Sequence, residues 1–194
     1  MPNLIKVPVR GADSEARVID HQWARLDKAA SAELLTTQIS DALKTAYGVL
    51  VHWEDALTAG LDRDQLRHDL GLTADNFGIW FDSDDEVERL GERCQQFPLI
   101  ALHFPKFVDG RSYSSAYLLR QRFGFTGELR AVGDVLVDQL FYMRRCGFDA
   151  FELRADKLVE DALNALNAFS VKYQGSIDRA EPLFRVADRP AANI

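Results

Sequence analysis

Residues 99–153 read LIALHFPKFVDGRSYSSAYLLRQRFGFTGELRAVGDVLVDQLFYMRRCGFDAFEL. Three short apolar runs alternate in this stretch with two longer amphipathic patterns. The apolar runs are residues 99–104, 128–132 and 148–153. The amphipathic patterns begin near Ser112 and Asp134, whose side chains suit the start of a helix. Strands that alternate with helices of this size predict βαβ units, and therefore neighbouring strands that run parallel.

The same alternation continues on both sides of this stretch. Upstream, apolar runs at residues 49–51 and 77–81 precede helical patterns that begin near Asp62 and Ser83, and downstream a helix is expected from Asp156. The sequence therefore predicts an α/β fold with a mostly parallel sheet of about five strands flanked by helices. We expect this sheet to be either open and doubly wound or curled like part of a barrel, because five strands are too few to close a barrel of eight.

The two ends of the chain depart from this alternation. Short β-like runs at residues 4–9 and 16–20 predict a small hairpin, so residues 1–30 are expected to form an N-terminal β appendage. Ser31 is expected to cap the first helix. Residues 175–194 are expected to form an extended tail. The length of 194 residues predicts a single α/β domain.

The composition argues against several classes of protein. Lysine and arginine number 23 against 30 aspartate and glutamate residues, and the resulting net charge of −7 argues against charge-driven binding of nucleic acid. Two cysteines are too few for an iron–sulfur cluster or a zinc site built on four cysteines. Because motifs for dinucleotides and nucleoside triphosphates are missing, neither a cofactor nor a metal is evident. We expect a cytoplasmic protein, since no segment resembles a signal peptide or a membrane span.

Cations and hydroxyl groups gather where the predicted strands end. Lys106 and Arg111 precede the helix that begins at Ser112, and Tyr113 and Ser114 follow in its first turn. The start of a helix offers unpaired N–H groups and the positive end of a dipole, and arginine can bind an oxyanion through two hydrogen bonds. These residues therefore predict a site for a small anion at the carboxyl ends of the strands.

Further candidate residues belong to the same strand ends. Arg130 and Arg154 are candidates to add charge to the anion site, and Asp109 and Asp134 are candidates to orient the cations. A structural interpretation stays open, in which these arginines only pair with neighbouring acidic residues. His103 is a candidate general base because the unperturbed pKa of histidine is about 6.5, and the alternative is a histidine held in the core.

The remaining titratable residues carry weaker signals. Cys94 shares a stripe with apolar residues and is expected to be a buried thiol. Cys146 lies beside two arginines, which favour a lowered thiol pKa, at a helix end whose dipole opposes it. The three histidines other than His103 show no metal-ligand spacing. The acidic run at residues 82–86 is interpreted as a helix start that complements the helix dipole.

Four motifs in the middle of the chain are long and close together. They read FPKFVDGRSYS at 104–114, LRQRFGFTGELRAVGDV at 119–135, DQLF at 138–141 and RCGFDAF at 145–151. Through these motifs the chain resembles a bacterial family known as domain of unknown function 934, with residues 99–154 as the family core. The resemblance implies an oxidoreductase or accessory protein associated with the sulfite reductase of assimilatory sulfur metabolism. It implies no established catalytic residues.

Three functions are consistent with these features. The first is an accessory protein of assimilatory sulfite reduction that binds a small oxyanion, or an anionic group of a partner or cofactor, at the strand ends. The second is an interaction module that docks on sulfite reductase or its electron donor through an acidic surface and aromatic side chains. The third is an enzyme with His103 or Asp134 as general base. None of the three involves a nucleic acid or a membrane.

Overall fold

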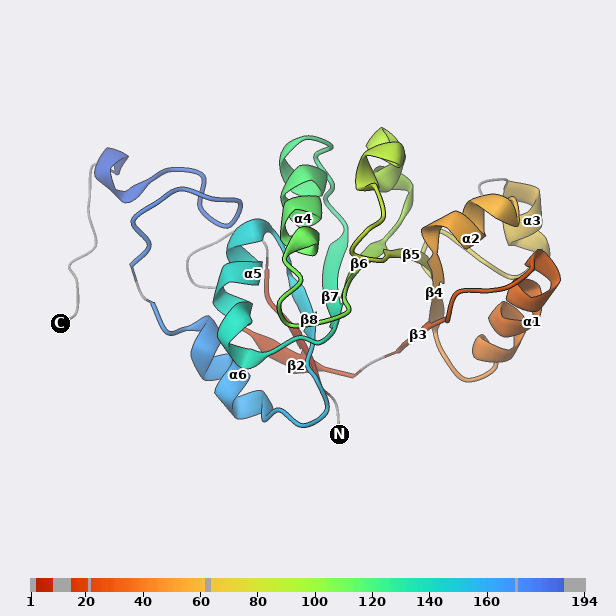
Figure 1. Cartoon of the computed structure of the whole chain (residues 1–194), viewed down its shortest axis with the longest axis horizontal. Helices are drawn as coiled ribbons and strands as arrows, with labels where there is room; N and C mark the ends of the chain where they lie inside the picture. Colours follow the sequence, from red (N-terminus) through yellow and green to blue (C-terminus); the bar gives the residue numbers. More distant parts are fainter. Residues whose placement is uncertain (1–2, 9–14, 21, 62–63, 170, 187–194) are drawn as a thin grey trace.

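The structure, a computed structural model, describes residues 3–8, 15–20, 22–61, 64–169 and 171–186. Within these residues, eight strands form one curled, mixed sheet that has the form of a half-barrel (Figure 1). The strands are β1 (Leu4–Lys6), β2 (Arg17–Ile19), β3 (Trp23–Arg25), β4 (Gly48–His52), β5 (Phe77–Phe81), β6 (Leu99–Phe104), β7 (Glu128–Gly133) and β8 (Ala150–Glu152). Their order across the sheet is β2-β1-β8-β7-β6-β5-β4-β3.

Helices connect most of the successive parallel strands. The α-helices are α1 (Ala32–Ala42), α2 (Trp53–Thr58), α3 (Asp64–Asp69), α4 (Arg111–Gln121), α5 (Leu140–Cys146) and α6 (Val159–Leu166). Short 3₁₀ turns are η1 (Val87–Arg89), η2 (Gly91–Gln96), η3 (Val137–Gln139) and η4 (Leu183–Arg185). Among the residues described, no helix combines the length and the apolar character needed to cross a membrane.

The direction of the strands corrects the predicted architecture. Strands β3 to β8 run parallel and follow one another in chain order, whereas β1 is antiparallel to both β8 and β2. Because every right-handed crossover then moves the same way, each helix is carried to the same face of the sheet. The doubly wound arrangement is therefore wrong, and the curled arrangement is found. The sheet is mixed and has eight strands, not a mostly parallel set of about five.

The additional strands come from the N-terminal part of the chain. Strand β1 pairs with β2, as the predicted hairpin requires, although the expected turn lies outside the described residues. Strand β1 also pairs with β8, where Ile5 lies opposite Phe151. Leu4 and Ile5 are buried as a result. The N-terminal strands thus belong to the main sheet and are not an appendage.

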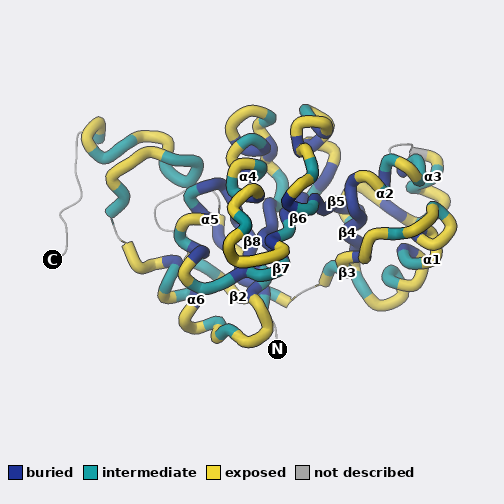
Figure 2. Tube along the Cα trace, viewed as in Figure 1, coloured by how far each residue is buried: buried dark blue, intermediate teal, exposed yellow. Residues whose placement is uncertain are grey.

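Side chains alternate between the two faces of the strands. On the face covered by helices, Val51, Ile79 and Leu102 join the main core. On the inner face of the curl a second cluster forms. Its members are Leu50, Trp80, Leu99, Ala101 and Val132. The buried segments follow the strands in Figure 2, with exposed segments in the surrounding turns and helices. Both faces of the central strands are therefore buried, which explains why these strands read as continuous apolar runs.

Most predicted helix starts are present. Ser31 caps α1 by accepting a hydrogen bond from the N–H of Leu34 at 3.2 Å. Helix α4 begins one residue before Ser112, and α6 begins three residues after Asp156. Asp134 is followed first by the turn η3, and α5 begins only at Leu140. Asp62 lies outside the described residues. The helix expected near Ser83 is wrong, because the chain there forms only the turns η1 and η2.

Candidate functional site

Two histidines and a tryptophan lie together at the carboxyl ends of three neighbouring parallel strands. His52 ends β4, Trp80 lies near the end of β5, and His103 lies near the end of β6. The centre of the Trp80 ring is 4.7 Å from that of His52 and 5.9 Å from that of His103. By the alternation along each strand, all three side chains lie on the inner face of the curl. In open α/β sheets and in barrels, ligands bind at this end of the strands.

The loop after β5 holds both imidazole rings. Asp82 Oδ1 lies 3.0 Å from Nδ1 of His103, and Asp85 Oδ2 lies 2.9 Å from Nε2 of His52. The backbone N–H of Asp82 also donates to Asp85 Oδ2 at 2.6 Å, so the two carboxylates are fixed relative to one another. We call His52, Asp82, Asp85 and His103 the histidine cluster.

Asp82 stays ionised at neutral pH. Burial alone raises the pKa of this carboxyl, but hydrogen bonds from His103, from the N–H of Ser83 and from Lys28 together lower it to about 2. Because an ionised carboxylate only accepts hydrogen bonds, Nδ1 of His103 carries the proton that is shared with Asp82. In the neutral ring, Nε2 is then the basic nitrogen.

The edge of the His103 ring that carries Nε2 lies against a glycine. The side chain of His103 is 21% exposed, whereas that of His52 is 3% exposed. Gly133 ends β7 with φ at 97°, and a Cβ there would lie 2.6 Å from Cδ2 and 2.9 Å from Nε2 of His103. In the described part of the chain, Nε2 of His103 has no hydrogen-bond partner. The glycine therefore leaves room for the ring, and Nε2 is not engaged by another described residue.

Two cations lie over the tryptophan between the histidines. The Arg25 guanidinium and the Lys28 ammonium lie 5.3 and 5.8 Å from the centre of the Trp80 ring, and both side chains are exposed. Burial lowers the pKa of Lys28, but the hydrogen bond to Asp82 and the negative charges of Asp82, Asp85 and Asp84 together outweigh it, so the pKa is raised. Positive charge beside a basic imidazole suits an anionic substrate, or negative charge that develops when a proton is removed. The arrangement can thus perform acid–base chemistry.

The residues of the predicted anion site lie beside the histidine cluster but bind one another. Both carboxylate oxygens of Asp109 accept hydrogen bonds from the Arg111 side chain, at 3.0 and 2.7 Å. Arg111 also donates to Ser83 Oγ at 2.8 Å. Ser112 Oγ donates to the backbone carbonyl of His103 at 2.8 Å. An added oxyanion would therefore compete with Asp109 for Arg111. The hydroxyl of Ser112 is already engaged by its hydrogen bond to β6.

The other members of that predicted site have different surroundings. The ring of Tyr113 packs against Phe104 and Tyr142, with centroids 5.2 and 5.1 Å away. Burial raises the pKa of Tyr113 to about 12. Lys106 and Ser114 are exposed. Tyr113 thus contributes packing.

The arginine within β7 and the arginine that follows β8 do not join the other residues of the predicted anion site. Arg130 is buried within β7 and pairs with Glu128 of its own strand at 2.6 Å. Arg154 donates to Asp134 at 2.8 Å and to Asp156 at 2.6 Å. The second oxygen of Asp134 accepts the N–H of Phe107 at 2.8 Å. These arginines pair with acidic residues, as the structural interpretation expects.

Sequence reasoning missed most of the histidine cluster. His52 shows no metal-ligand spacing, the acidic run at residues 82–86 indicates only a helix start, and the sequence carries no functional signal at Lys28 or Trp80. One signal was present. His52 ends the run GVLVH, His103 lies one residue before the end of LIALHF, and Asp82 directly follows FGIWF. Comparing the ends of successive strands would have brought these residues together, because parallel strands end at one edge.

The cysteines are both buried, as expected for Cys94. Burial raises the pKa of the Cys94 thiol and also that of Cys146, where it outweighs the neighbouring Arg145. Of the opposing influences that the sequence suggests at Cys146, those that raise the thiol pKa prevail, with burial the largest. Within the described ranges, no three or more His, Cys, Asp or Glu side chains have an arrangement that would hold a metal ion.

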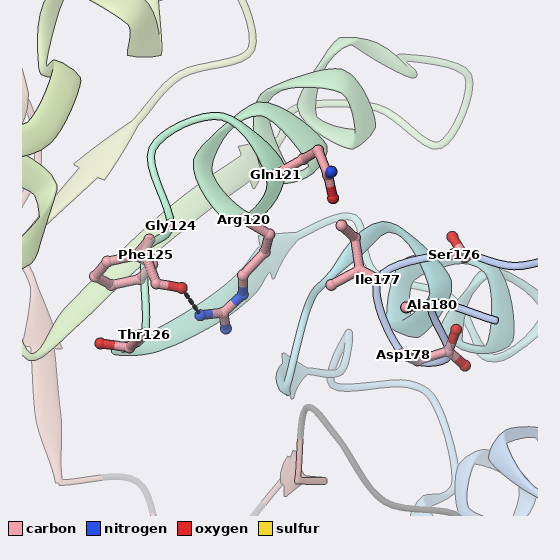
Figure 3. A pocket seen from close by; sticks show the side chains of 9 residues that line it. All are labelled: Arg120, Gln121, Gly124, Phe125, Thr126, Ser176, Ile177, Asp178 and Ala180. Atoms are coloured by element: carbon pink, nitrogen blue, oxygen red, sulfur yellow. Dashed lines mark hydrogen bonds between the residues drawn. The ribbon is translucent and has the colours of Figure 1, made fainter.

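A separate cavity of about 610 Å³ lies between the end of α4 and residues 176–180 (Figure 3). Its charged side chains already have partners. Arg120 donates to the carbonyls of Phe125, Gly127 and Gly147 at 2.6 to 2.9 Å, and Asp178 pairs with Arg145 and Lys172. No residue of the histidine cluster lines this cavity.

Comparisons with known proteins place the chain in a family without assigning it an activity. No curated protein and no solved structure matches the sequence. A family model described as "Bacterial protein of unknown function (DUF934)" matches residues 78–184, which is more than half of the chain and extends beyond the predicted core at residues 99–154. The match includes Asp82, Asp85 and His103 but not His52. The chain belongs to this bacterial family of unknown function, DUF934.

Proposed function

We propose that this protein is an enzyme that performs acid–base chemistry on a small substrate at the carboxyl ends of β4, β5 and β6. His103 is the general base, Asp82 orients its ring, and Lys28 stabilises negative charge on the substrate. The observation that carries the proposal is the 3.0 Å contact between Asp82 and Nδ1 of His103. Because Nδ1 carries the proton in this contact, Nε2 is the nitrogen of the partly exposed ring that can accept a proton.

His103 is a better candidate for the base than Asp134. Both oxygens of Asp134 accept hydrogen bonds, from the N–H of Phe107 and from Arg154. These contacts give Asp134 a structural role, in which it holds the turn after β6 and the Arg154 side chain. The acid–base proposal is also better supported than a separate anion site, because Arg111 and Arg154 already bind carboxylates.

An association with sulfite reductase or its electron donor rests on the family resemblance and stays a prediction. Of the aromatic side chains near the family core, Phe107 and Tyr117 are exposed, as a docking surface would require, whereas Phe125 is buried. No cofactor is needed for the proton transfer that we propose at His103.

The first test of the proposal follows the NMR signals of the His103 ring. The protein is labelled with ¹⁵N-histidine, and its signals are followed by NMR as carboxylates, phosphate monoesters and sulfite are added. We expect a neutral Nδ1–H tautomer at His103, and a compound that shifts the His103 signals and is then turned over. His103→Gln should abolish turnover. His68→Gln is the control, because that side chain is 87% exposed and outside the cluster. An Nε2–H tautomer, or turnover that survives in His103→Gln, contradicts the proposal.

The predicted pathway is tested separately in cells. A bacterium that lacks the gene should fail to grow on sulfate and recover with added cysteine, if the protein acts in sulfite reduction. A plasmid with the unchanged gene or with His68→Gln should restore growth, and His103→Gln should not. Normal growth of the deletion strain on sulfate contradicts the pathway alone. Restoration by His103→Gln contradicts the role of the base alone.

A further inference from the structure

A second, smaller cavity of about 150 Å³ lies on the helix-covered face of the sheet. Its walls come from α2, α3, β5 and the segment that leads into β6. The apolar side chains that line it are those of Trp53, Ala56, Leu57, Leu61, Phe77 and Phe97. An engineered apolar cavity of about 150 Å³ in another protein binds benzene. The cavity is therefore large enough for an apolar body the size of one aromatic ring.

Two cations also line this cavity. They are Arg67 and Arg93, and no carboxylate is among the described residues that line the walls. Arg93 binds the backbone carbonyls of Leu90 and Arg89 at 3.4 and 3.0 Å, and its guanidinium lies 5.2 Å from the Trp53 ring centre. Over the described part of the chain, Arg93 forms no ion pair. Its charge is therefore not balanced by an acidic group.

The tryptophan in the wall supplies an independent observation. Trp53 is 3% exposed, and its indole Nε1 is buried without a hydrogen-bond partner among the residues described. The other indole near the strand ends, that of Trp80, donates to the carbonyl of Leu26 at 3.0 Å. A buried N–H without an acceptor is uncommon and destabilising. An acceptor atom of a ligand would satisfy it.

We propose that this cavity binds a small carboxylic acid with an apolar body of about the size of a benzene ring. The apolar body lies against Leu61, Phe77 and Phe97. The carboxylate binds Arg93 and accepts the hydrogen bond of Trp53 Nε1. The site is independent of the histidine cluster, because it lies on the opposite face of the sheet.

Benzoate is the probe, and benzamide is its neutral counterpart of nearly equal shape. Binding is followed in the ¹H–¹⁵N spectrum, where the chain has three indole N–H signals. At about 10 mM benzoate, a concentration that fills most of a millimolar site, we expect the Trp53 indole signal to shift and the Trp80 signal to stay. Arg93→Gln should weaken benzoate about tenfold and leave benzamide unchanged, and Arg93→Lys should restore part of the affinity.

Arg89→Gln is the matched control. Arg89 lies on the neighbouring turn, is exposed, and pairs with Glu54 at 2.9 Å, so its loss should leave benzoate affinity unchanged. His103→Gln should also leave this affinity unchanged, which separates the inference from the proposed function. The inference is overturned if the Trp53 signal does not move, if Arg89→Gln weakens benzoate as much as Arg93→Gln, or if benzoate shifts only the His103 and Trp80 signals.

Discussion

At the level of single residues, the position of His103 depends on a glycine in the neighbouring strand. Gly133 has φ at 97°, and a Cβ there would lie 2.5 Å from the carbonyl oxygen of Phe104 and 2.6 Å from the His103 ring. A positive φ alone penalises any other residue, and here steric overlap is added. The histidine that we propose as the base thus fits only beside this glycine.

Gly133→Ala should therefore destabilise the protein more than strain alone explains. Gly71→Ala is the control, because Gly71 also has a positive φ, at 71°, and a Cβ added there would meet no atom within 4 Å. We expect a loss of unfolding free energy of about 1 kcal/mol for Gly71→Ala and about 3 kcal/mol for Gly133→Ala, measured by urea unfolding. Only Gly133→Ala should change the His103 NMR signals. Equal losses for the two variants would show that His103 is not held by this contact.

At the level of the elements, Arg120 connects α4 to the loops on either side of β7. Its guanidinium donates to carbonyls of Phe125, Gly127 and Gly147 and pairs with Asp149 at 3.2 Å. Asp149 in turn accepts the N–H of Leu129 at the start of β7. Burial raises the pKa of Asp149 to about 6, although Arg120 opposes this rise.

Arg120→Ala should lower the unfolding free energy by about 3–5 kcal/mol, because it leaves a buried acid and three carbonyls without their donor. The loss should be larger at pH 7.5 than at pH 5. A carboxyl whose pKa is raised in the folded state destabilises that state as the pH rises through the folded pKa, and loss of Arg120 raises this pKa further. Arg122→Ala, at an exposed position of the same helix end, should change stability by about 0.5 kcal/mol or less. A loss that is independent of pH would contradict the coupling to Asp149.

At the level of the whole molecule, the sheet is completed by the N-terminal strands. Strand β1 covers the edge of β8 in antiparallel register, and Ile5 is fully buried. An appendage would contribute little to the stability of the rest. A strand that completes the sheet contributes to the same core.

Ile5→Ala should therefore destabilise the whole domain. We expect a loss of about 2–5 kcal/mol, as for other large core side chains, with a single cooperative transition in urea. Leu158→Ala is the control, since Leu158 is 67% exposed, and its loss should be about 0.5 kcal/mol or less. A small effect of Ile5→Ala, or a separate early transition, would return the N-terminal strands to the status of an appendage.

The five central strands were predictable because their burial is visible in the residues themselves. A parallel strand that is covered on both faces reads as a continuous apolar run, as in residues 99–104. Strand β3 has only three residues, Trp23–Arg25, with no such run. The missing helix after Ser83 has another cause, because the acidic side chains there bind histidines from β4 and β6.

The sequence by itself determined the α/β class, the parallel central strands, the cap at Ser31 and the buried thiol of Cys94, since each depends on local periodicity or local hydrogen bonding. Only the tertiary structure decided the strand order, the half-barrel curl and the partners of the charged residues. The arginines of the predicted anion site pair with acidic groups, whereas His52, Asp82, Asp85 and His103 come together from three strand ends. Distances between residues some 20 to 50 positions apart depend on the order of the strands and on the curl of the sheet. No local pattern in the chain specifies this order or this curl.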